Sequence, residues 1–232
     1  MLLLSIILLL TCDRNVIGST RVQCDNADDE CITETIKDHV YAQFIAGSPG
    51  VESSDPLRLD AINADLTNLK FSLKNPTLFG MKECNFVQLK LTVEKGLFSY
   101  KLLCPKLNLQ SEYEVKGGIE GTAVEGKGSC KINYDNYSIR IFGKSERVKY
   151  EDGTLHVNIL EHNYDLTLMS VATTDYENLV IGDNNKVDTY SKKLEETTRE
   201  IVMKSFIEKL VRNLKDFHKA KPFTELHFRL TK

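Results

Sequence analysis

The sequence lacks an excess of basic residues. Lysine and arginine total 30 against 33 aspartates and glutamates, which gives a formal net charge of -3 and a pI near 6.0. Proteins that bind nucleic acid carry a basic patch or stripe. Nucleic acid is therefore excluded as a partner, and so are anionic membrane surfaces.

The sequence also lacks the common catalytic motifs. It contains no G-x-S-x-G elbow, no H-E-x-x-H run and no Cys/His nucleophile pattern. The glycines at 117–128 lack the Lys-Ser/Thr ending of a phosphate-binding loop and lie between predicted strands, where glycine lets a strand bend. His156 and His162 flank Glu161 without an evident third ligand, so we interpret them as a solvated pair. We expect no catalysis, no metal site and no cofactor.

The apolar run at residues 2–11 contains one serine and is too short to cross a membrane. Its length is typical of the hydrophobic region of a signal peptide, although lysine and arginine are missing before it. Val16 and Gly18 are small residues that suit cleavage after Gly18. We therefore predict a signal peptide at 1–18, a single secreted domain at 19–232, and no stable membrane insertion.

Removal of the signal peptide leaves five cysteines, at positions 24, 31, 84, 104 and 130. An oxidising compartment favours disulfides, and the short loop between Cys24 and Cys31 makes this pair the first candidate. Cys84 and Cys104 lie on neighbouring predicted strands and could also bridge. At least one of the three remaining cysteines must stay unpaired within a monomer.

Residues 186–219 contain neither glycine nor proline, and their apolar side chains recur at helical spacing. The stripe predicts one helix of roughly 30 to 34 residues, about 45 to 50 Å long. Asp183 or Asn184 can cap its start. The charged residues between the stripe positions, including Glu195 and Arg199, alternate in sign, which predicts a solvated face. The apolar stripe consists of Val187, Tyr190, Leu194, Ile201, Val202, Phe206, Leu210, Leu214 and Phe217.

A second, shorter helix is predicted from a stripe between Ile32 and Ile45, and Gly47 and Pro49 end it. From about 55 to 170 the period changes to two, as in Leu69, Phe71 and Leu73, which predicts about eight half-buried strands. Turn signals at 95–96, 116–118 and 152–153 favour an antiparallel sheet. The fold class is α+β, with the sheet wrapped around the long helix, because each has an apolar face to cover.

One cluster of motifs is more specific than this periodicity. It consists of Pro105-Lys106-Leu107-Asn108-Leu109, Tyr113, Gly117-Gly118 and Val124-Glu125-Gly126-Lys127-Gly128. The cluster resembles the P-x-L-x-L, Y-x-x-x-G and G-x-G run of the insect takeout and haemolymph juvenile-hormone-binding protein family. Asp55-Pro56-Leu57, the Gly80 turn and the early pair Cys24 and Cys31 also match, and the resemblance spans the mature chain.

The resemblance implies a long helix wrapped by a highly curved antiparallel sheet, as in lipid-transfer proteins. It also implies a secreted, non-catalytic carrier of a small lipophilic ligand, either a terpenoid or a fatty-acid-like molecule. The juvenile-hormone-binding branch ties its long helix to the sheet with a second disulfide. The long helix here contains no cysteine, so the resemblance does not single out juvenile hormone. We expect the protein to be a monomer.

A curved sheet around a straight helix leaves apolar gaps that can hold a ligand. Large inward-facing candidates for lining them, each of which could also be plain core, are Phe44, Leu57, Leu69, Phe71, Tyr134, Leu168, Leu194, Ile201 and Phe206. Thr198 interrupts the stripe: its hydroxyl either bonds back to the preceding turn or meets a polar group of the ligand. Asn136 begins a glycosylation sequon. The alternatives are an interaction protein with a packed interior and, third, a hydrolase of lipid esters.

Overall fold

The computed structural model describes residues 22–25, 28–182, 186–222 and 228–231. The predicted signal peptide and the predicted capping residues Asp183 and Asn184 lie outside the described residues. Among the described residues, no helix combines the length and hydrophobicity needed to cross a bilayer.

Among the described residues, the main sheet has nine strands, close to the predicted eight, and is antiparallel. Its central strands, β6 and β7, are unusually long and form a hairpin through most of the molecule. The strands are β2 (Leu57–Arg58), β3 (Ala61–Leu66), β4 (Leu69–Phe79), β5 (Asn85–Thr92), β6 (Leu97–Ile119), β7 (Thr122–Lys149), β8 (Leu155–Leu168), β9 (Thr173–Tyr176) and β10 (Leu179–Ile181). A separate parallel pair joins β1 (Val22–Asp25) to β11 (Phe228–Thr231).

The sheet bends where its long strands change the face that they bury. On β6 the buried positions run 100, 102, 104 and then 107, 109, while on β7 they run 130, 132, 134 and then 137, 139, 141. The changes on β6 and β7 lie at the same level of the hairpin, because Pro105 and Asn136 fall between the pairs Cys104–Tyr137 and Lys106–Asp135. Pro105 has no amide hydrogen, and Asn136 has a φ of +55°. On β4 a bulge between Lys74 and Thr77 makes the same change. The concave face therefore continues around the bend.

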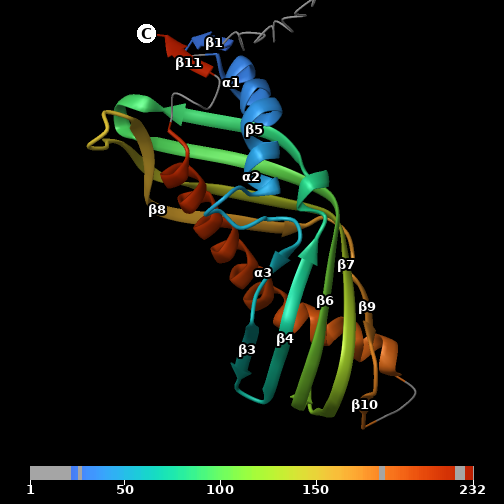
Figure 1. The fold of residues 1–232 in the computed structure, drawn as a ribbon. Coiled ribbons are helices and arrows are strands. Elements are labelled where there is room, and N and C mark those ends of the chain that lie inside the picture. Colours follow the sequence, from blue (N-terminus) through green and yellow to red (C-terminus); the bar gives the residue numbers. More distant parts are fainter. Residues whose placement is uncertain (1–21, 26–27, 183–185, 223–227, 232) are drawn as a thin grey trace, which may run out of the picture.

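Helix α3 (Val187–Ala220) has 34 residues, which confirms the predicted length. It lies along the concave face of the sheet, with α1 (Asp29–Ile36) and α2 (Ala42–Ala46) over the upper part beside β5 (Figure 1). The π-helical turn η1 (Lys37–Tyr41) joins α1 to α2, and short 3-10 turns η2 (Met81–Glu83) and η3 (Val93–Lys95) flank β5. The buried apolar side chains of both helical segments and the sheet form one core.

The two cysteine pairs considered from the sequence, Cys24–Cys31 and Cys84–Cys104, both form disulfides. Among the described cysteines, Cys130 is free, and it is buried. The second disulfide joins Cys84, between η2 and β5, to Cys104 of β6.

Three sequence expectations were wrong. Lys116, Gly117 and Gly118 do not form a hairpin turn, because they lie inside β6 and the turn falls at Glu120 and Gly121. Gly117 instead lets another backbone approach: a Cβ there would lie 2.1 Å from the carbonyl oxygen of Asn68. Gly126 lies inside β7, where a Cβ would lie 2.6 Å from the Tyr113 hydroxyl. These glycines make room for close contacts within strands.

The histidines are also not a solvated pair. His156 is buried, and its ring contacts the Thr154 hydroxyl at 2.9 Å and the carbonyl oxygen of His218 at 3.2 Å. His162 contacts Glu208 of α3 at 3.0 Å. Both rings therefore help to seat α3 on β8. Among the described residues, no cluster of three or more potential ligands could hold a metal ion.

The third error concerns Glu195, which was assigned to a solvated face and is only 1% exposed. Its carboxylate accepts two hydrogen bonds from Arg199, at 2.6 Å from Nε and 2.5 Å from Nη2. These hydrogen bonds are the main reason that the pKa of Arg199 is raised. The charged stripe of α3 is therefore interrupted by an ion pair inside the fold.

Candidate functional site

A cavity of about 380 Å³ lies at the end of the sheet that α1 and α2 cover. The N-terminal helical segment supplies Ile36, Val40, Tyr41 and Phe44, and the C-terminal part of α3 supplies Leu214 and His218. The sheet supplies Phe86, Leu89, Leu91, Leu97, Phe98, Tyr100, Val157 and Ile159. Gly96, Ser145, Glu146 and Arg147 also line it. The cavity is thus bordered by both helical segments and four strands, and most of its described lining is apolar.

Aromatic rings form one side of this cavity. The ring of Tyr100 stacks on those of Phe86 and Phe98, with centroids 5.9 and 6.4 Å apart. Tyr41 packs at 5.8 Å from Phe86 and so links the helical cover to the sheet. Such contacts fix the positions of large rings around the space that they enclose.

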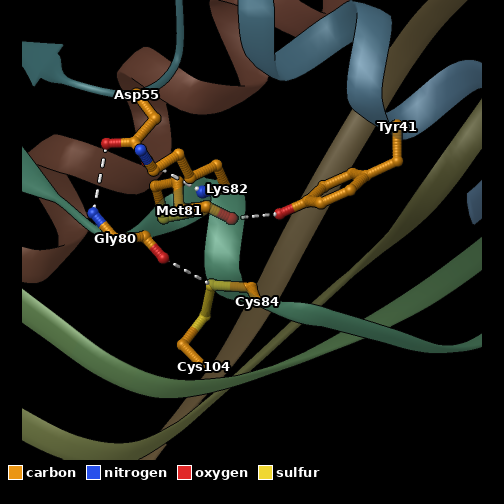
Figure 2. Close-up of a disulfide and its surroundings, with 7 residues drawn as sticks. All are labelled: Tyr41, Asp55, Gly80, Met81, Lys82, Cys84 and Cys104. Atoms are coloured by element: carbon orange, nitrogen blue, oxygen red, sulfur yellow. Dashed lines mark hydrogen bonds between the residues drawn. A yellow bond between two sulfur atoms is a disulfide. The ribbon is translucent and has the colours of Figure 1, made fainter.

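Figure 2 shows how Tyr41 of the helical segment and Asp55 of the loop after it are held to the turn η2. The Tyr41 hydroxyl donates a 2.7 Å hydrogen bond to the carbonyl oxygen of Met81. The Asp55 carboxylate accepts from the backbone amides of Gly80 and Lys82, at 3.1 and 3.0 Å. The Cys84–Cys104 disulfide lies next to this turn. The wall of the cavity at Tyr41 is therefore anchored by hydrogen bonds beside a covalent link.

The charged groups of the lining lie at its exposed edge. Glu146 and Arg147 are both exposed, on the part of β7 that leads to the hairpin with β8. Apolar side chains follow β8 outward from buried Ile159 through half-buried Val157 to exposed Leu155. The charged groups at this exposed edge therefore remain hydrated.

Among the ten residues predicted to contact a ligand, Phe44 lines this cavity. The other nine are not in its wall. Leu57, Leu69, Phe71, Tyr134, Leu194 and Phe206 are buried in the common core, and Leu168 and Ile201 are half-buried against it. The Thr198 hydroxyl donates a 2.8 Å hydrogen bond to the carbonyl oxygen of Leu194, the first of its two predicted alternatives.

The sequence reasoning missed the lining residues of β5, β6, β7 and β8 and the end of α3. One signal was present, since Leu89 and Leu91 belong to an alternating run and Leu214 to the helical stripe. Periodicity identifies the buried face of each element but not the distance between two faces. The position of the cavity depends on that distance.

Comparison with known proteins gives a family and a fold. The family model described as haemolymph juvenile hormone binding protein matches residues 3–223. The crystal structure of Takeout 1 from Epiphyas postvittana aligns with a TM-score of 0.79 and 25% sequence identity, over 88% of this chain and 98% of that chain. A lipopolysaccharide binding protein structure aligns with a TM-score of 0.38 and 10% identity, over 79% and 35% of the two chains. No curated protein sequence matches.

Proposed function

Because the chain belongs to the haemolymph juvenile hormone binding protein family, we propose that it is a secreted carrier of one small lipophilic molecule. The ligand occupies the cavity between α1, α2, the end of α3 and strands β5 to β8. The observation that carries this proposal is a 380 Å³ space with a mostly apolar lining. Its volume lies in the range of small-molecule sites in proteins, roughly 300 to 1,000 Å³.

Partition of apolar surface out of water drives binding. A terpenoid or fatty ligand that buries about 400 Å² gains on the order of 10 kcal/mol at ~25 cal/mol per Å². The loss of translational and rotational freedom offsets part of this gain. The dissociation constant then falls between roughly micromolar and 10 nanomolar. No bond is made or broken, so the protein returns its ligand unchanged.

Two disulfides support secretion, because such bonds form and persist in oxidising compartments. The proposal includes signal-peptide removal after Gly18 and action as a monomer. It also includes a glycan on Asn136, whose side chain is exposed on β7.

A displacement titration tests the carrier function. A hydrophobic fluorophore should bind saturably to the wild-type protein, and terpenoid esters or fatty alcohols should displace it and be recovered unchanged. Val157→Trp places an indole in the cavity wall and should weaken binding about tenfold or more. Val180→Trp is the matched control, because Val180 is a strand valine that is 59% exposed on β10.

Non-saturable binding to the wild-type protein would contradict the carrier function. Equal weakening in both tryptophan variants would place the bound fluorophore outside this cavity. Either result would favour a protein that acts through its surface.

A further inference from the structure

Five buried side-chain polar atoms have no hydrogen-bond partner among the described residues: Ser48 Oγ, the hydroxyls of Tyr100, Tyr134 and Tyr176, and His218 Nδ1. Buried polar groups in folded proteins are almost always paired, so each exception requires an explanation. Two of the five, on Tyr100 and His218, belong to side chains in the wall of the cavity.

The hydroxyl of Tyr41 differs from that of Tyr100, because it has a hydrogen-bond partner. Tyr41 also lines the cavity, but its hydroxyl is already bonded to the carbonyl oxygen of Met81. Tyr100 lies on β6 and His218 near the end of α3, so the two unpaired atoms come from opposite layers of the fold. A molecule that fills the cavity lies against both side chains.

Both groups are uncharged at neutral pH. Burial lowers the pKa of His218 to about 4, and burial raises the pKa of Tyr100 far above its ordinary value. The charged members of the lining, Glu146 and Arg147, are exposed at its edge. A carboxylate that entered the cavity would therefore lose its hydration without meeting a buried cation among the described lining residues.

We propose that Tyr100 and His218 are the specificity-determining contacts for an uncharged oxygen function of the ligand. The ligand is then a lipophilic molecule with a hydroxyl, ether, carbonyl or ester oxygen. The Tyr100 hydroxyl donates a hydrogen bond to that oxygen. His218 Nδ1 donates to an acceptor or accepts from a hydroxyl, depending on which ring nitrogen carries the proton. This inference rests on the carrier function proposed above.

The test compares ligands that differ only in the polar group. A linear alkane and the primary alcohol, methyl ester and carboxylic acid of the same chain length each displace the fluorophore from the wild type, Tyr100→Phe and His218→Phe. Tyr176→Phe is the control, because it also removes an unpaired buried hydroxyl but is not in the cavity wall.

The wild type should bind the alcohol and the ester more tightly than the alkane, and the acid less tightly than the ester. Tyr100→Phe or His218→Phe should reduce the preference for the oxygenated ligands about fivefold, the effect of one ordinary hydrogen bond. Affinity for the alkane should stay within about twofold, and Tyr176→Phe should keep the wild-type preference. If His218→Phe does not fold, Tyr100→Phe decides, since it removes a single oxygen atom.

An unchanged preference in the cavity variants, with normal binding of all ligands, would overturn the assignment of these residues and leave the carrier function standing. Failure of the wild type to bind any of the ligands, the alkane included, would instead contradict the carrier function itself.

Discussion

The buried ion pair on α3 gives the sharpest prediction about stability. The side chain of Glu195 is 2% exposed and that of Arg199 is 27% exposed, and they form a bidentate pair one helical turn apart. The Arg199→Met substitution would leave the carboxylate in the interior without its two donors. The aromatic neighbours that share its electrostatic environment, Tyr134 and Tyr176, are themselves buried and unpaired.

Removal of one partner of a buried ion pair costs about 3–5 kcal/mol, whereas replacing both partners by apolar side chains is often neutral. Because Arg199 is partly exposed, we expect the lower end, about 3 kcal/mol, for Arg199→Met. The double variant Glu195→Met/Arg199→Met should lie within about 1 kcal/mol of the wild type. A control exists in Arg140–Asp165, a pair at 3.3 Å whose side chains are 49% and 60% exposed. Arg140→Met should cost less than about 1 kcal/mol.

Urea denaturation followed by circular dichroism measures these differences in the free energy of unfolding. The expected order of stability is wild type and double variant together, Arg140→Met slightly below them, and Arg199→Met lowest. If Arg199→Met loses no more than Arg140→Met, the pair is effectively solvated and the reasoning is refuted. If the double variant is as unstable as Arg199→Met, packing rather than charge pairing explains the loss.

Three further predictions concern single groups. Burial raises the pKa of the Cys130 thiol to about 12, so iodoacetamide should label it at pH 8 only after unfolding; rapid labelling of native protein would refute this. For His218, the folded pKa of about 4 lies below its ordinary value of 6.5, so the unfolded chain takes up the proton first as the pH falls. Its contribution to stability is complete above pH 6.5 and is lost toward pH 4. The urea midpoint of His218→Phe should therefore depend less on pH across that window than the midpoint of the wild type, and an equal pH dependence in both would contradict the prediction. Protein secreted by eukaryotic cells should lose a glycan mass on Asn136→Gln, whereas identical masses for the two proteins would show that the sequon is unused.

The periodicity of the sequence was sufficient to predict the main elements. The apolar stripe from Val187 to Phe217 predicted the long helix, and period-two alternation predicted the sheet. Alternation failed to show that Tyr134 and Tyr137 lie on one strand, because the buried face changes at Asn136. In a sequence, such a change in which positions are apolar resembles the end of a strand. Here the partner strand β6 changes its buried face at the same level, at Pro105, so the pairing continues.

The errors at Glu195 and His156 have a common cause. The sequence pattern placed each of these polar residues on a solvent-facing side. Each is buried because it has a hydrogen-bond partner: His156 contacts the carbonyl oxygen of His218, and Glu195 accepts from Arg199 one helical turn away. Hydrogen-bond partners can offset the cost of burial, but the sequence pattern does not reveal them. The sequence predicted an apolar space between the long helix and the sheet but not the residues that line the cavity, since only Phe44 of the ten predicted contacts lies in its wall.

The most direct test of the central claim is to locate a bound lipophilic molecule by NMR, with methyl groups of the protein labelled. Intermolecular nuclear Overhauser effects should connect the ligand to methyls of Ile36, Val40, Leu89, Val157 and Ile159, which line the cavity. The methyls of Leu57, Leu69 and Leu194, buried in the core outside the cavity wall, should show none. Contacts confined to these three leucines, or to exposed positions such as Leu160 and Val180, would contradict the account.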